Sequence, residues 1–254
     1  MNESISWILL FYILISMGCG EPTQEHKIEK LIQKLGVKDP SVRHISVSEL
    51  GSIGSTDVVP ALIQALQDQD AKVRVSVALA LGKIGSVDAV STLIQALRDP
   101  DAKVRRRVAL ALGSIGSVDA VPALIQALQD QDVSVRVSMV EGLGGIGKGA
   151  VPALIQALRD NNEYIRGGAV EALKRIGKGA VSALILALQD ENTDVRVRAA
   201  ETLKRIGTGA VPALIQALQD KKTNVRVSAA FVLEKIGKDA VPALIQALQD
   251  QDAK

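Results

Sequence analysis

The amino-acid sequence predicts an all-α fold, a right-handed α-solenoid (superhelix) of about seven and a half two-helix repeats. Three landmarks recur every 31 residues at first and every 30 residues later, without the alternation typical of β-strands. They are a leucine (Leu31, Leu62, Leu93, Leu124, Leu154, Leu184, Leu214, Leu244), an arginine after Val or Ile (Arg43, Arg74, Arg105, Arg136, Arg166, Arg196, Arg226) and a glycine after Ile (Gly54, Gly85, Gly116, Gly147, Gly177, Gly207, Gly237).

Each repeat contains the start and stop signals of two short helices. In residues 57–85, Asp57 is expected to cap the first helix, and Pro60 lies in its first turn, where the missing N–H costs nothing. Asp70 is expected to cap the second helix, and Gly85 to end it in the left-handed conformation. Neither helix is long enough to be stable alone, so stacking must bury their apolar faces.

Composition narrows the function classes. Hydrophobic residues make up 47% of the chain but aromatic residues only 2%, so the core must be aliphatic. The net charge of +2 gives no electrostatic footprint for nucleic acid, and nucleic-acid binding is disfavoured. A single cysteine, Cys19, excludes an internal disulfide.

The repeat unit resembles a known family. The carrying residues are Asp-Ala-Val-Pro-Ala-Leu-Ile-Gln-Ala-Leu, followed by Asp-x-x-Val-Arg-x-x-Ala-x-x-x-Leu-x-x-Ile-Gly. They are similar to HEAT-like repeats of the short bacterial type, which also occur in phycobilisome lyase subunits. The resemblance covers residues 28–254 and predicts the fold far more specifically than the function.

The resemblance also implies a structural ladder, in which an aspartate after the first helix pairs with the arginine that opens the second. Val37 stands where Arg43 would need its aspartate, so the first repeat departs from this pattern. A row of arginines could also bind phosphate, but the ladder is favoured because each arginine has its own acid. The expected pairs are Asp68/Arg74, Asp99/Arg105, Asp130/Arg136, Asp160/Arg166, Asp190/Arg196 and Asp220/Arg226.

The N-terminal residues differ from the repeats. An apolar run at residues 7–15 is followed by small residues and Cys19, which resembles a bacterial lipoprotein signal with Cys19 as the lipid attachment site. Ser16, where leucine is usual, and the lack of Lys or Arg in the first four residues depart from that pattern. An ordinary signal peptide, an uncleaved anchor or a buried helix are the alternatives. We therefore expect a signal segment at 1–19, a tether at 20–27 and the solenoid at 28–254.

No catalytic or cofactor site is expected. Residues 142–147, GLGGIG, match the dinucleotide fingerprint formally, but they lie inside an expected helix rather than between a strand and a helix. The helix-weakening glycines Gly142, Gly144 and Gly145 instead predict a flexible point in the fourth repeat. His26 and His44 do not form the His-Glu pairs that hold metal in some HEAT-like enzymes. We expect a protein that is not an enzyme, with no metal and no small-molecule substrate.

A recognition face is predicted where the repeats differ from one another. One position of the second helix carries either apolar groups or glutamate, so it should be accessible to solvent. Drift among recently duplicated repeats is the alternative explanation. With the variable positions next to the arginine, the candidate partner-binding residues are Leu79, Arg106, Arg107, Leu110, Glu141, Glu171, Arg198, Glu201 and Phe231.

The favoured function is a non-enzymatic protein–protein interaction scaffold that presents a concave surface to an unidentified protein partner. It is expected in the bacterial cell envelope, either lipid-anchored, so that it reaches the membrane through its N-terminus, or periplasmic or secreted. The alternative is an accessory or lyase-type subunit related to phycobilisome lyases. The last repeat is incomplete, which indicates either a piece of a longer solenoid or an open edge that docks another chain.

Overall fold

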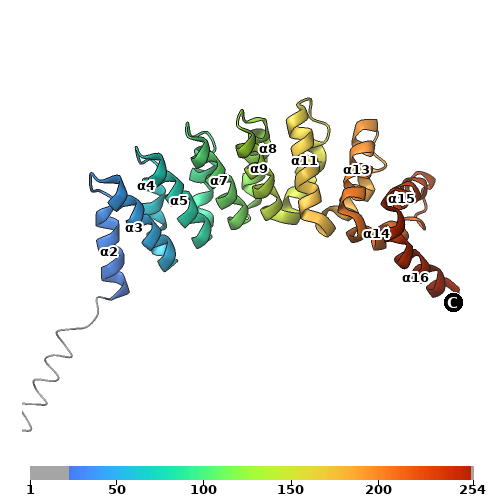
Figure 1. The fold of residues 1–254 in the computed structure, drawn as a ribbon, viewed down its shortest axis with the longest axis horizontal. Coiled ribbons are helices and arrows are strands. Elements are labelled where there is room, and N and C mark those ends of the chain that lie inside the picture. The colour runs from blue at the N-terminus through green and yellow to red at the C-terminus, as the bar shows by residue number, and fades with distance from the viewer. Residues whose placement is uncertain (1–22, 253–254) are drawn as a thin grey trace, which may run out of the picture.

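A computed structural model describes residues 23–252, which form an extended arch of stacked helices without a strand among them (Figure 1). The predicted all-α solenoid is therefore confirmed. The first helices of the repeats are α2 (Gln24–Lys34), α4 (Val59–Ala65), α6 (Val90–Ala96), α8 (Val121–Gln126), α10 (Val151–Ala157), α12 (Val181–Ala187), α14 (Val211–Ala217) and α16 (Val241–Asp252). The second helices are α3 (Pro40–Ile53), α5 (Ala71–Ile84), α7 (Ala102–Ile115), α9 (Val133–Ile146), α11 (Glu163–Ile176), α13 (Thr193–Ile206) and α15 (Thr223–Ile236).

The solenoid begins slightly earlier than the sequence indicates. Thr23 caps α2, and the helix begins at Gln24, so residues 24–27 of the expected tether are helical. The apolar run and Cys19 lie outside the described residues, as do residues 253–254.

The cap predicted for the second helix of residues 57–85 is confirmed, and the cap predicted for its first helix is wrong. Asp70 accepts hydrogen bonds from the N–H groups of Lys72 and Val73 at the start of α5. Asp57 does not cap α4, because it lies inside a 3-10 turn that Ser55 caps instead. The serine supplies the oxygen that the sequence reading assigned to the aspartate.

The core is a continuous aliphatic column along the stack. The landmark leucine of each middle repeat, Leu62 to Leu214, is fully buried, and second-helix residues such as Leu81 and Met139 are buried against it. These side chains cannot be covered within one two-helix repeat, so each repeat depends on its neighbours for stability.

The turns between repeats have two geometries. After α3, α5 and α7, glycines Gly54, Gly85 and Gly116 adopt the left-handed conformation, with ψ of 8°, 16° and 13°. After α9, the turn is one residue shorter, and Gly147 has φ 71° with ψ −136°. Only glycine adopts this region readily, so the landmark glycine ends every second helix but in two different ways.

The second helices of the first four repeats approach one another very closely. A Cβ added to Gly82 would lie 2.8 Å from the Cα of Ala111, and one added to Gly113 would lie 2.6 Å from the Cα of Gly142. The same position holds Lys174 in α11, Lys204 in α13 and Glu234 in α15. Long side chains cannot fit that contact, so the chain divides into a tightly packed part up to α9 and a more widely spaced part after it.

The glycines of α9 have a packing role. A Cβ on Gly145 would lie 2.8 Å from the carbonyl oxygen of Gly113, and Gly142 faces the backbone of Ala109 on α7. The prediction that these glycines weaken the helix stays a prediction, but their absence of side chains lets α9 lie directly against α7.

Candidate binding face

The arginine ladder crosses between repeats instead of closing within one. Arg74 donates through Nε to Oδ2 of Asp99 at 2.7 Å and through NH2 to Oδ1 at 2.8 Å, although the sequence paired Arg74 with Asp68. Arg74 reaches the same repeat through backbone alone, donating to the carbonyl oxygens of Asp68 and Gln69. The predicted pairing is therefore wrong, and the acid that Arg74 binds lies 25 residues further along.

The first repeat belongs to this ladder. Arg43 binds Asp68 at 2.6 Å and 2.8 Å, and it donates to the carbonyl oxygens of Val37 and Lys38. Val37 does not break the ladder pattern, because Arg43 binds the backbone carbonyl oxygen at this position, which any residue supplies. Arg105 binds Asp130 at 2.7 Å and completes the three pairs.

The ladder stops where the turns shorten. Arg136, Arg166 and Arg196 retain their bonds to carbonyl oxygens of their own repeats. Among the described residues, however, none of these three guanidinium groups forms an ion pair with an acid. At one of these junctions Asp190 pairs with Arg159, which lies in the turn that follows α10. The three arginine–aspartate ion pairs of the ladder thus occur at the three junctions that have the longer turn, after α3, α5 and α7.

The closed pairs shift ionisation in the expected direction. The hydrogen bond from Arg43 lowers the pKa of the Asp68 carboxyl, although partial burial opposes the shift. Burial alone would raise the pKa of the Asp130 carboxyl. The hydrogen bonds from Arg105 and from the Asp132 N–H together outweigh burial, so the pKa is lowered. The pKa of Arg74 is raised by its hydrogen bond to Asp99. The lowered pKa values keep the Asp68 and Asp130 carboxylates charged at neutral pH, where each binds an arginine of the preceding repeat.

We call the positions five residues after each ladder arginine from α5 to α15 the recognition face; they are Leu79, Leu110, Glu141, Glu171, Glu201 and Phe231. Leu79 is 38% exposed and Phe231 is 50% exposed, whereas Leu110 is half-buried. The three glutamates are half-buried or exposed. The structure therefore places this position on the surface of the second helices, as the alternation of apolar and acidic residues indicates.

Two of the glutamates form a second ladder that the sequence reading missed. Glu141 lies 4.0 Å from NH1 of Arg175, and Glu171 pairs with Arg205 and lies 3.9 Å from Nζ of Lys174. Each arginine follows its glutamate by 34 residues, in the recurring segment Leu-Lys-Arg-Ile. That recurrence was the available signal. These acids link neighbouring second helices and are only partly available to a partner.

The candidate arginines have different surroundings. Arg106 is exposed next to the ladder residue Arg105, whereas Arg107 and Arg198 are half-buried one position further along. Ser76 and Ser138 occupy that same position and are buried. The position therefore faces the neighbouring repeat, and Arg198 has a buried Nε without a hydrogen-bond partner among the described residues.

A groove separates α13 from α15. It has a volume of about 600 Å³, and Glu201 and Phe231 of the recognition face lie in its walls. At the matching junction of α5 and α7, the hollow beside Leu79 and Leu110 has only about 140 Å³. The hollow beside the recognition face is therefore small at the α5–α7 junction and large at the α13–α15 junction.

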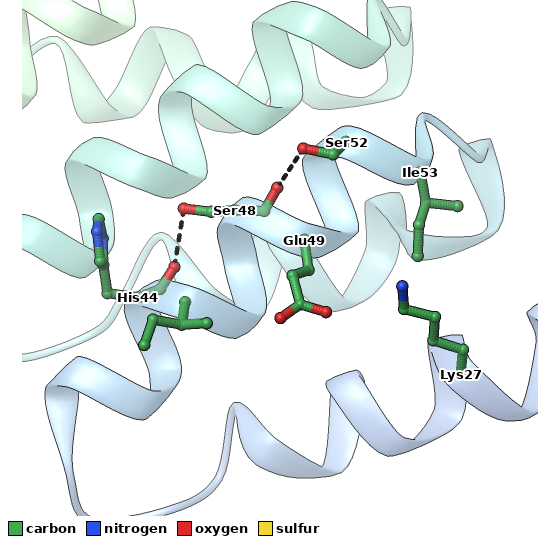
Figure 2. Close-up of a pocket in the computed structure, with 7 residues that line it drawn as sticks. Lys27, His44, Ser48, Glu49, Ser52 and Ile53 are labelled. Carbon is green, nitrogen blue, oxygen red and sulfur yellow. Dashed lines mark hydrogen bonds between the residues drawn. The ribbon is translucent and has the colours of Figure 1, made fainter.

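A second cleft, of about 560 Å³, lies between α2 and α3 (Figure 2). Its serines are not free donors, because Ser48 donates to the carbonyl oxygen of His44 at 3.0 Å and Ser52 to that of Ser48 at 2.9 Å. The His44 ring bonds Ser76 of α5 at 2.6 Å. The bonds of Ser48 and Ser52 tie both hydroxyl groups to their own helix, and the His44 ring is held against α5.

No group of three or more His, Cys, Asp or Glu side chains within residues 23–252 could hold a metal ion. None of the helices in that same part of the chain is both long enough and apolar enough to span a membrane.

The chain is similar to several solved structures, each with a TM-score below 0.5. The complex of CpcE and CpcF of phycocyanin lyase from Nostoc sp. is 25% identical, covering 89% of this chain and 94% of that one, with a TM-score of 0.49. An engineered protein is 23% identical, covering 82% and 68%, with a TM-score of 0.44. Human deoxyhypusine hydroxylase in complex with glycerol is 20% identical, covering 84% and 96%, with a TM-score of 0.40. No curated protein matches the chain significantly.

Family comparisons agree with the repeat pattern. Residues 104–130 match the PBS lyase HEAT-like repeat. HEAT repeats match residues 28–99, 121–185 and 181–254, which together span more than half of the chain. The chain therefore belongs to the HEAT-repeat family.

Proposed function

We propose that the chain is a non-enzymatic scaffold whose recognition face binds a protein partner. The observation that supports this most directly is the exposure of Leu79 and Phe231 at matching positions of α5 and α15. Isolated apolar groups are common on protein surfaces, but repetition at one helical position aligns them along a single face. An extended face of stacked helices is suited to a protein or peptide rather than to a small substrate.

The proposal is tested by capture of partners from a bacterial envelope fraction with the full chain as bait. Leu79→Glu and Phe231→Glu each introduce the residue that α9, α11 and α13 already carry at this position, so the fold is retained. We expect wild-type protein to retain a partner that the double variant loses. Arg106→Glu should weaken the same capture. A partner retained equally by all variants contradicts the recognition face.

We also propose that the scaffold is exported and held at the membrane of the bacterial cell envelope. The support comes from the apolar run at residues 7–15 and the cysteine that follows it, Cys19. Metabolic labelling with a radioactive fatty acid should mark the wild-type chain and not Cys19→Ser. Labelling of both, or recovery of unlabelled wild-type chain in the cytoplasmic fraction, contradicts the anchor.

The alternative is an accessory or lyase-type subunit, which the match of residues 104–130 to the PBS lyase HEAT-like repeat favours. Tyr164 and Phe231 are the aromatic side chains of the described residues that could contact a chromophore. A purified chain that carries visible absorbance from a pigment-producing host would support this reading. A colourless chain that captures a protein partner supports the scaffold.

A further inference from the structure

We infer that the groove between α13 and α15 binds an acidic peptide segment that carries a large apolar side chain. The inference rests on the proposed scaffold function and specifies the chemistry of the partner. The groove is lined by apolar side chains, among them Val197, Val227 and Phe231, and by the charged residues Arg196, Glu201, Lys204 and Lys235.

The groove is open for a steric reason. At the junction of α5 and α7, Gly82 lets the helices meet, because its missing Cβ would lie 2.8 Å from the Cα of Ala111. The matching residues at the junction of α13 and α15 are Lys204 and Val232. Both are too large for that contact, so the two helices stand apart and a hollow remains between them.

The groove also lacks the ion pair that spans the preceding junction. Glu171 of α11 pairs with Arg205 of α13, and the matching residues one repeat later are Glu201 and Lys235. The Lys235 ammonium instead lies 3.3 Å from the Glu234 carboxylate and 5.1 Å from the centre of the Phe231 ring. The space between Glu201 and Lys235 is therefore not bridged, and the apolar floor beneath it is accessible.

The floor offers an apolar contact. Val197 is 60% exposed, Val227 is 62% exposed and Phe231 is 50% exposed, and all three line the same hollow. Ala200 and Ser228 are small, so they leave room between these larger groups. An apolar side chain of a partner that entered this hollow would contact the exposed apolar lining and remove part of it from water.

The charges around the floor select an acidic partner. Three cationic residues, Arg196, Lys204 and Lys235, line the groove against one acid, Glu201. The Arg196 guanidinium already donates to the carbonyl oxygens of Asp190 and Glu191, and Lys235 pairs with Glu234, so the Lys204 ammonium is the most available of the three charges. Within residues 23–252 no acid forms an ion pair with Lys204. A carboxylate on either side of the apolar anchor would meet these ammonium groups, whereas a basic segment would be repelled.

Two synthetic peptides test the inference on the full chain. One is Ser-Glu-Glu-Phe-Leu-Glu-Glu-Ser, and the other replaces each Glu with Lys. The protein carries isotope-labelled valine methyl groups, observed by NMR. We expect saturable shifts at Val197 and Val227 with the acidic peptide, weakened by added salt, and none with the basic peptide.

Matched variants place the binding in the groove. Lys204→Glu combined with Lys235→Glu should weaken the acidic peptide by about tenfold or more, as should Phe231→Ala. Lys83→Glu changes an exposed lysine at the α5 position that matches Lys235, so it should leave the affinity unchanged. Circular dichroism confirms that each variant is folded; these side chains are exposed, so their replacement leaves the core intact.

Several results would overturn the inference. They are equal binding of both peptides, binding unchanged by the groove variants, or no saturable shift at Val197 and Val227. Concentration-dependent shifts without peptide would assign the groove to a second copy of the chain, and shifts with duplex DNA would assign it to nucleic acid. If the groove variants still capture the envelope partner while Leu79→Glu does not, this inference fails and the scaffold stands. If no recognition-face variant alters capture, the proposed function fails.

Discussion

Arg74 and Asp99 lie in successive repeats and form a two-pronged ion pair, with Nε–Oδ2 at 2.7 Å and NH2–Oδ1 at 2.8 Å. Oδ1 of Asp99 also accepts the N–H of Asp101 at 2.9 Å, where α7 is about to begin. Arg74 meanwhile donates to two carbonyl oxygens of its own repeat. One pair therefore joins the loops that precede two successive second helices.

Removal of that carboxylate should loosen the junction of α5 and α7. Asp99→Asn keeps an oxygen for the Asp101 N–H but loses the charge that binds Arg74. We expect a cost of about 1–3 kcal/mol, because Asp99 is mostly buried and Arg74 loses its ionic partner. Native-state hydrogen exchange of the α5 and α7 amides measures it as a change in the free energy of local opening.

The control for this change lies in the open part of the chain. Asp220→Asn alters the matching aspartate of α14 and α15, which accepts the Lys222 N–H at 2.8 Å but does not bind the Arg196 guanidinium. We expect a change within about 0.5 kcal/mol. Equal costs at both sites would mean that the ion pair contributes nothing beyond the turn.

Replacement by alanine should lower the stability of the fold at Gly113 and raise it at Gly167. Gly113→Ala would place a Cβ 2.6 Å from the Cα of Gly142, so α7 and α9 must move apart at a net cost of about 1–2 kcal/mol. Gly167→Ala in α11 meets no atom within 4 Å and should stabilise the helix by up to about 1 kcal/mol. Thermal unfolding of the two variants gives both signs, and stabilisation by Gly113→Ala would contradict the close approach of the helices.

Stability should fall in acid partly through Asp68. Its pKa is lower in the folded chain than the value of about 3.9 in an unfolded one, because Arg43 binds its charged form. The folded state then holds fewer protons, so the stabilisation is fully present above that unfolded pKa. It is lost as the pH falls below about 4 and through the folded pKa. Urea unfolding at several pH values should show this slope.

Asp68→Asn should make that acid slope shallower without abolishing it. Asp130 and Asp190 also have lowered pKa values and contribute to the slope in the same direction. An unchanged slope in the variant would show that the Arg43–Asp68 pair is not coupled to folding.

Turn length should control closure of the ladder. Replacing Lys148-Gly149 with Ser-Val-Asp converts the short turn after α9 to the long form found after α5 and α7. We expect Arg136 to gain the ion pair with Asp160 that it lacks, and α9 and α11 to move closer. A crystal structure of the variant tests the pair, and small-angle scattering tests the change in overall dimensions. If Arg136 and Asp160 stayed unpaired in the long-turn variant, turn length would not be what controls the ladder.

The local structure of each repeat was readable from the sequence because it depends on few residues. Pro60, Asp70 and Gly85 occupy positions that only certain residue types suit, so their patterns predict helix boundaries. The prediction that Asp57 caps the first helix was wrong, since Ser55, two residues earlier, caps the 3-10 turn that precedes this helix. The change of period from 31 to 30 was visible, but its effect on Gly147 required backbone angles that a spacing does not contain.

The site was harder to predict, because its contacts join residues of different repeats. Arg74 has Asp68 nearby in sequence and Asp99 a repeat away, and spacing alone favours the nearer acid. Exposure of Leu79 and Phe231 followed from comparing repeats, since glutamate occurs at their position. The pairing of Glu171 with Arg205 and the groove beside Lys204 depend on how far apart two helices lie, which side-chain volumes decide only after stacking.

The landmark glycine has a left-handed conformation in the first half of the chain and a different ψ in the second half. The two halves should therefore differ in stiffness. Under a pulling force the halves would act as springs in series, and the softer spring takes most of the extension. The part after α9, with longer side chains between its second helices and no arginine bridge from its ladder, is the softer one. A partner that bound both halves would therefore stretch the second half more than the first, and the α13–α15 junction would extend before the first repeats separated.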